Sequence, residues 1–334
     1  MALDTWIRDS LTLPAVCAPM TLVSGPDLVA EACKAGVIGA LQPANAGSFE
    51  GFQAWMRQID DSLKRHADAN PKARIAPLAI NLSSTKSPVE LADDLALSIR
   101  HGVRIFISVM GNPTEIARRV HDAGGILIHD ITTMAHAEKA IGAGVDGLTC
   151  IGAGGGGHSG TISHLALIPK IRAMFDGIVI MAGAVSTGAA VRAGEILGAD
   201  LSYLGTRFIA TKEALGPDEY KELLVSETAK ELIYTSGVTG LPSNWLKESL
   251  RRKGLDPDNL PRPSGHSRDY SHLPKQARPW KTIFSAGQGI DLIDDVPSVA
   301  ELVRRLRREY VAACTIPDMA DIARLVDEAL DKGA

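Results

Sequence analysis

The stretch "GIVIMAGAVSTGAAVRAGEILGA", residues 177–199, carries the pattern on which the fold depends. It begins with a nearly continuous apolar run, continues through a turn of small residues, and ends with apolar residues at helical spacing. A continuous apolar run fits a parallel strand buried on both faces, and glycine is a preferred residue just after a helix. The stretch therefore predicts one strand followed by one helix.

The same unit recurs along the first two thirds of the chain. Each short apolar run is followed by a turn and an amphipathic stretch, and the predicted strands are residues 14–20, 37–42, 76–82, 104–111, 125–132, 146–154, 177–185 and 201–208. Eight such units in a little over 200 residues predict a (β/α)8 TIM barrel. A doubly wound open sheet is the alternative that the pattern leaves open.

The composition changes after about residue 235, which suggests a boundary. We expect residues 1–234 to form the barrel core with a ligand site at the carboxyl ends of its strands. Residues 235–284 are rich in Pro, Gly and Ser, and they predict a small lid-like insertion on the substrate side with a helix near 243–253. Residues 285–334 predict C-terminal helices over 297–313 and 317–332 that pack back on the barrel.

Charge and composition exclude several classes of protein. The net charge is −4 and lysine and arginine do not cluster beyond one helix face, which argues against nucleic-acid binding. The chain contains no apolar run of about 18 residues and its N-terminus does not resemble a signal peptide, so we expect a cytoplasmic protein without a membrane span. No metal site is predicted, because histidine pairs lack acidic partners at useful spacing. We expect reduced, buried cysteines at Cys17, Cys33, Cys150 and Cys314.

The ends of the seventh and eighth predicted strands have the composition of an anion site. "MAGAVSTG" contains Ala182, Gly183 and Ala184, and "LGTRF" contains Leu204 and Gly205. Glycine allows backbone N–H groups to approach an anion closely, and barrels commonly bind phosphate after these two strands. The two turns therefore suggest a phosphate-binding site. The alternative is that the glycines only allow tight turns.

The sixth strand runs into "IGAGGGGHSG", residues 151–160. A glycine loop can approach a planar ligand and can flex like a lid. His158 is the titratable group in the run, and imidazole exchanges protons near neutral pH. We interpret His158 as a functional residue because the run follows a buried strand at the catalytic end of the barrel; a surface histidine in a disordered glycine tract is the alternative.

These segments together resemble the nitronate monooxygenase family, formerly 2-nitropropane dioxygenases, to which flavin-type enoyl-ACP reductases are related. The resemblance rests on "APM" (18–20), "GGGGHSG" (154–160), "MAGAV" (181–185), "LGTRFIATKEA" (204–214) and "SAGQGIDLIDDVPSVAEL" (285–302). It spans nearly the whole chain, and the histidine motif together with "GTRFIATKEA" is specific. The resemblance implies a barrel that binds FMN.

The resemblance also implies roles for individual positions. FMN phosphate contacts are implied for Gly183, Ala184, Gly205 and Thr206, with Ala182 and Leu204 beside them, and flavin-ring contacts for Ala18, Pro19 and Met20. Asn81 would contact the ring or the ribityl chain, and Gln288 would approach the cofactor or the substrate. His158 would be the catalytic residue, with Gly157 beside the cofactor. These are expectations carried over position by position.

Asp130 departs from the family pattern. Many members have Gln or Lys near the end of the fifth strand, whereas this chain has "IHDITT". We include Asp130 among the cofactor-binding residues and expect an anion there, which would disfavour a reduced, anionic flavin. The sequence therefore implies that Asp130 points elsewhere or that His129 compensates.

Three functions remain in competition. The leading one is an FMN-dependent nitronate monooxygenase that oxidises alkyl nitronates with O2 to a carbonyl compound and nitrite. The second is an FMN-dependent reductase that passes hydride from NAD(P)H to enoyl thioesters or quinones. The third is a barrel that binds a phosphorylated metabolite without redox chemistry. The expected partner is a small-molecule substrate, and a homodimer is left open.

Overall fold

The structure, a computed structural model, describes residues 3–83, 86–263, 269–315 and 324. Within these ranges eight parallel strands close into a barrel, with the first paired to the last. The barrel strands are β1 (Ala15–Cys17), β2 (Ile38–Leu41), β3 (Leu78–Ser83), β4 (Ile105–Val109), β5 (Ile126–Ile131), β6 (Gly147–Ile151), β8 (Ile178–Ala182) and β9 (Leu201–Leu204). Closure confirms the predicted (β/α)8 barrel over an open sheet, which would keep two unpaired edges.

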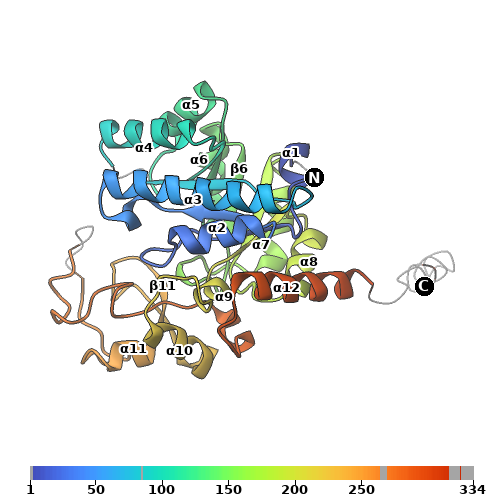
Figure 1. The fold of residues 1–334 in the computed structure, drawn as a ribbon. Coiled ribbons are helices and arrows are strands. Elements are labelled where there is room, and N and C mark those ends of the chain that lie inside the picture. The colour runs from blue at the N-terminus through green and yellow to red at the C-terminus, as the bar shows by residue number, and fades with distance from the viewer. Residues whose placement is uncertain (1–2, 84–85, 264–268, 316–323, 325–334) are drawn as a thin grey trace, which may run out of the picture.

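Helices cover the outside of this barrel (Figure 1). They are α1 (Thr5–Arg8), α2 (Pro26–Lys34), α3 (Phe49–Ala69), α4 (Pro88–Arg100), α5 (Thr114–Asp122), α6 (Met134–Gly142), α7 (His164–Arg172), α8 (Gly188–Leu197), α9 (Thr206–Ile209) and α10 (Asp218–Ser226), with 3-10 turns at Pro43–Ala46 and Ala229–Glu231. The C-terminal helix α12 (Val299–Cys314) packs against α8 and α2. The outward faces of the strands and the inward faces of the helices form the main core.

The barrel interior explains where a cavity can open. Ile105, Ile128, Ile180 and Leu201 belong to an apolar cluster in the interior. Small side chains, Ala18 and Ala182 among them, stand at the carboxyl ends of their strands. Large residues therefore fill the barrel, while small ones leave room at its catalytic mouth.

A second, three-stranded sheet lies outside the barrel. Its order is β10 (Leu232–Thr235), β11 (Ser243–Leu246) and β7 (Gly157–His158), all paired antiparallel. It is followed by α11 (Lys247–Arg251), and a separate apolar core gathers around Trp245, Val238 and Ile283. Figure 1 shows β11 and α11 at one end of the barrel, together with α10.

Three predicted strands end three residues early, at Cys17, Ile151 and Ala182, and two further elements differ more. The eighth barrel strand was expected to reach 208, but it ends at Leu204 and the next residues turn into α9. The helix expected near 243–253 begins only at Lys247, because the preceding four residues pair with β10 and β7 as strand β11. The helix predicted over 297–313 is α12, whereas the one over 317–332 lies outside the described residues apart from 324.

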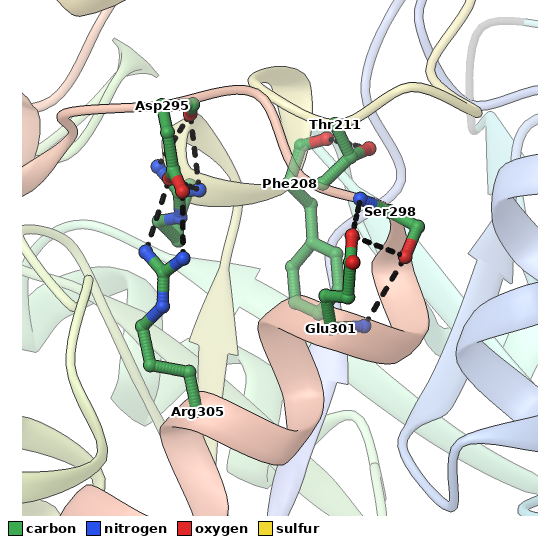
Figure 2. Close-up of polar contacts among 7 residues, drawn as sticks. Phe208, Thr211, Asp295, Ser298, Glu301 and Arg305 are labelled. Atoms are coloured by element: carbon green, nitrogen blue, oxygen red, sulfur yellow. Dashed lines mark hydrogen bonds and ion pairs between the residues drawn. The ribbon is translucent and has the colours of Figure 1, made fainter.

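A polar network fixes the chain beyond the barrel (Figure 2). The Arg207 guanidinium is 2 % exposed and donates to the Asp295 backbone oxygen at 3.2 Å and to Asp295 Oδ1 at 3.1 Å. Arg305 of α12 donates to the same carboxylate at 2.6 Å. Ser298 and Glu301 close a capping box at the start of α12. The network therefore joins α9, which follows the last barrel strand, to the C-terminal segment.

The cysteines are free thiols, and three of the four match the expectation of burial. Cys17, Cys33 and Cys150 are buried, but Cys314 is exposed, because it occupies the last residue of α12. Among the helices in the described ranges, none combines the length and the hydropathy that a membrane crossing requires.

Candidate active site

A cavity of about 1280 Å³ opens at the carboxyl ends of the barrel strands. Of the residues predicted for the site, it is lined by Ala18, Pro19, Met20, Asp130, Gly157, His158, Ala182, Gly183, Ala184, Gly205 and Thr206. A typical small-molecule pocket has about 300–1,000 Å³. The cavity therefore has room for a cofactor and a second ligand.

Three predicted residues do not line this cavity. Leu204 faces the helices and is fully buried in the outer core. Asn81 is 7 % exposed near the end of β3, without a place on the cavity wall. Gln288 begins the 3-10 turn Gln288–Leu292 with an exposed side chain, and its backbone N–H donates to the Gly154 carbonyl at 2.8 Å. The C-terminal segment instead reaches the cavity through Ser285, Gly287 and Gly289.

The turns after β8 and β9 present backbone N–H groups to the cavity. Within the described residues, the N–H groups of Gly183, Ala184, Gly205 and Thr206 donate no hydrogen bond to the protein. Gly183 has φ +116°, and an added Cβ would lie 3.0 Å from the Gly155 backbone nitrogen. Thr206 Oγ1 accepts from the Gly287 N–H at 2.9 Å, which leaves its own proton to donate. These groups have the arrangement that binds an anion.

The glycine run is hydrogen-bonded to the outer sheet along the cavity wall. Gly157 and His158 form β7 and pair with β11. The Asn244 side-chain amide donates to the Gly155 carbonyl at 2.7 Å, and the Tyr234 hydroxyl donates to the Ser159 carbonyl at 2.7 Å. Gly154 and Gly157 have positive φ values of 85° and 68°. The glycines therefore allow the backbone to turn tightly along the cavity wall, because residues with a Cβ would be strained at these positive φ values.

Two residues of the insertion, Ser243 and Trp280, contact the His158 ring. Its Nδ1 lies 2.7 Å from Ser243 Oγ, and Ser243 Oγ lies 3.2 Å from the Leu241 carbonyl oxygen. When the Ser243 hydroxyl donates to that carbonyl, its oxygen accepts a hydrogen bond from Nδ1–H of His158. The proton of the neutral ring is then on Nδ1, and Nε2 carries a lone pair. Burial lowers the pKa of His158, and the Pro242 carbonyl partly opposes this. The imidazole is therefore neutral near pH 7.

The Trp280 ring packs edge-on against the His158 ring, with centroids 5.4 Å apart at 72°. Trp280 has φ 58°, which is uncommon for a bulky residue, and its N–H donates to the Ile283 carbonyl at 2.9 Å. Such strain persists where surrounding contacts enforce it, often at ligand sites. Met110 and Ala184 also have positive φ values and also line the cavity.

Sequence reasoning missed Ser243, Trp280 and Tyr203. Ser243 and Trp280 lie in the Pro- and Gly-rich stretch, where no motif marks them, and they reach His158 only through tertiary pairing. Tyr203 lies inside a predicted strand, and only the inward face of a closed barrel brings it to the cavity.

Asp130 lines the cavity, and the expectation that it is an anion needs correction. Its burial raises the pKa to about 7, with the neighbouring Thr149 hydroxyl opposing the shift. His129 does not compensate: its Nδ1 lies 2.8 Å from Ser108 Oγ, and burial lowers its pKa to about 4. Asp130 is therefore poised between its neutral and charged forms at neutral pH.

Known proteins resemble this chain over most of its length. A nitronate monooxygenase from Paraburkholderia phytofirmans is 26 % identical and covers 89 % of this chain and 92 % of its own. The (3aS,4S,5R,7aS)-5-hydroxy-7a-methyl-1-oxo-octahydro-1H-indene-4-carboxyl-CoA dehydrogenase of Rhodococcus jostii is 27 % identical over 71 % of this chain. This chain spans only 63 % of that relative's length.

A solved structure and a family model point the same way. The nitroalkane oxidase from Streptomyces ansochromogenes superposes with a TM-score of 0.73 at 25 % identity, covering 93 % of this chain and 99 % of its own. The family model for nitronate monooxygenase matches residues 7–309. Because this match extends from α1 into α12 and includes every residue of the cavity wall, the chain belongs to the nitronate monooxygenase family.

Proposed function

We propose that this chain binds FMN and oxidises alkyl nitronates with O2 to a carbonyl compound and nitrite. The observation that carries the proposal is one cavity that joins unbonded backbone N–H groups, at the ends of β8 and β9, to the neutral imidazole of His158. Membership of the nitronate monooxygenase family supports the same reaction class.

The residues present fit a flavin mononucleotide. Gly183, Ala184, Gly205 and Thr206 would hold its phosphate, since their N–H groups are free and glycine leaves space for a close approach. Ala18 and Met20 would lie along the ring, on the wall where small side chains leave the barrel mouth open. FMN is favoured over FAD because these turns form a single phosphate cup and no GxGxxG fingerprint follows a strand.

His158 would act on the substrate's acidic proton. With Nδ1 bound to Ser243, the Nε2 lone pair takes the proton from the carbon beside the nitro group, and the C–H electron pair moves into the nitronate. The imidazolium then lies next to the anion that it has generated. The bound flavin supplies the electron acceptor for the oxidation that follows.

Two measurements test this proposal. Mass spectrometry of the released cofactor is expected to give FMN, and FAD would contradict the single phosphate cup. Parallel anaerobic titrations of the flavin with nitroalkane, nitronate and NADPH are expected to bleach it with the nitro compounds. Bleaching by NADPH alone would contradict the oxidase proposal.

A reductase of enoyl thioesters or quinones is the second candidate. The cavity volume of about 1280 Å³ favours it, because small alkyl nitronates would fill little of that space beside a flavin. The Rhodococcus relative is named for a carboxyl-CoA substrate. Rapid bleaching by NADPH followed by reoxidation with an enoyl thioester would select this candidate. A colourless protein that does not take up FMN would instead select a non-redox barrel that binds a phosphorylated metabolite.

Replacing Ser243 by alanine tests the orientation of His158. The change removes the hydroxyl at 2.7 Å from Nδ1, so the ring loses the contact that fixes its tautomer. One such hydrogen bond contributes about 1 kcal/mol, so we expect turnover to fall roughly fivefold while flavin stays bound. Ser249→Ala is the matched control, because Ser249 is equally buried but bonds to Leu246 and Phe284. Equal losses in both variants would mean that Ser243 only supports the fold.

A further inference from the structure

Three buried polar atoms inside the barrel form no hydrogen bond of ordinary geometry with the described residues, although the Thr149 hydroxyl lies close enough to Asp130 to lower its pKa. They are Asp130 Oδ1 on β5, Thr149 Oγ1 on β6 and the Tyr203 hydroxyl on β9. Asp130 lies opposite Thr149 in the strand register, and Asp130 and Tyr203 both line the cavity. Buried polar groups in native proteins are almost always hydrogen-bonded, so an unpartnered cluster at a cavity indicates groups that a ligand satisfies.

No cation balances Asp130 in the part of the chain that the structure describes. None of the ion pairs found there includes Asp130. The titratable groups that interact with it are Tyr203 from β9 and Cys150 from β6. Burial raises the pKa of both, to about 12 for Cys150, so both are neutral. Among the three clustered side chains, the carboxyl of Asp130 is the one that titrates near neutral pH; His129, His136 and Lys139 also line the cavity, on β5 and α6.

We propose that Asp130 is a proton-accepting residue for the bound flavin: it takes up one proton from solvent when the flavin is reduced, and then donates a hydrogen bond to the electron-rich ring. This inference rests on the proposed flavin binding. Two electrons come from the reductant, and one proton adds to the ring. The second proton comes from solvent and forms the O–H bond of Asp130, which neutralises the carboxylate charge; no bond of the side chain breaks.

The position of Asp130 favours the cofactor over the substrate as its partner. Asp130, Thr149 and Tyr203 lie on the barrel strands, and the turns whose N–H groups would hold the phosphate directly follow β8 and β9. His158 and Trp280 line the same cavity from the outer sheet and the insertion, and the buried Ser243 contacts His158. A ring bound along the barrel mouth would thus have Asp130 on the barrel side and His158 on the other. A neutral carboxyl removes the repulsion that an anion would exert on a reduced flavin.

The test is the number of protons taken up per two electrons, obtained from the pH dependence of the flavin midpoint potential. Between about pH 7 and pH 8 the carboxylate is the main form of Asp130 in the oxidised protein, so the wild-type protein should take up two protons per two electrons. Asp130→Asn cannot ionise and should take up one, with FMN still bound. Asp94→Asn is the control, because Asp94 is a buried carboxyl that pairs with Lys86 outside the cavity.

Each outcome has a defined meaning. A wild-type protein that binds FMN but takes up one proton overturns the role of Asp130 and leaves the proposed function intact; this measurement needs no variant to fold. Uptake of two protons by Asp130→Asn would overturn that role in the same way. A protein that binds no flavin overturns the proposed function and this inference together. Infrared difference spectra should also show the carbonyl band of a protonated carboxyl appearing on reduction in wild type, and its absence in Asp130→Asn.

Discussion

Replacement of His158 by alanine is expected to lower turnover of a neutral nitroalkane by about 100- to 10,000-fold, the usual loss when a positioned acid–base group is removed. The physical reason is that the neutral imidazole beside Ser243 is the base that the cavity offers on the side of the outer sheet. FMN should remain bound, because its phosphate site is built from β8 and β9. Steady-state rates on purified, flavin-loaded protein measure the effect.

The loss should depend on the charge of the substrate. A preformed nitronate needs no base, so its oxidation should fall much less than that of the nitroalkane. Because burial lowers the pKa of His158, wild-type activity on the nitroalkane should rise with pH through an ionisation below the ordinary histidine value of about 6.5, and the variant should lack that rise. His136→Ala is the control, since His136 lines the same cavity but lies on α6. Small, equal losses on both substrates would make His158 a bystander.

Replacement of Gly205 by aspartate is expected to abolish flavin binding without unfolding the barrel. The new carboxylate would stand beside N–H groups that the phosphate requires. Two unit charges 4 Å apart repel by about 4 kcal/mol near a protein surface, which weakens binding on the order of 1,000-fold. Gly205 has φ −102°, and an added Cβ would lie 3.8 Å from its nearest neighbours, so the backbone accepts a side chain. Flavin absorbance after gel filtration reports the loss.

Controls at the same position separate charge from size. Gly205→Ala should keep nearly full flavin, and Gly205→Asn should keep more than the aspartate variant, because it adds similar volume without charge. Gly183 is a poorer choice for this experiment: its φ is +116° and a Cβ would meet the Gly155 nitrogen at 3.0 Å, so strain would mix with charge. Full flavin occupancy in Gly205→Asp would refute the phosphate assignment.

The repeated strand–helix unit was sufficient to predict the barrel. Buried parallel strands need continuous apolar runs, and helices need a 3.6-residue period, so both signals are local. The failures arose where a segment's conformation depends on distant partners. Residues 243–246 have no strand signal of their own and become β11 because β10 and β7 flank them.

The site was predictable to the extent that it follows strand ends. Gly183, Ala184, Gly205 and His158 reach the cavity wall because parallel strands bring their carboxyl ends together. Which side chains of the C-terminal segment reach the cavity was not predictable: Gln288 is exposed and lies off the cavity wall, although its glycine neighbours line the cavity. The charge of Asp130 also depends on burial, which a residue letter does not report.

The pairing of β7 with β11 has a consequence for the synthesis of the chain. His158 and Ser243 are 85 residues apart, so at about 5–20 residues per second a ribosome needs roughly 4–17 s to make the partner after His158 has been added. During that interval the glycine run has no strand to pair with, and the last barrel strands emerge before the outer sheet exists. A nascent chain that stops after residue 234 should therefore assemble barrel strands while His158 still lacks its partners, so under the proposed function activity should appear late in the folding of this protein.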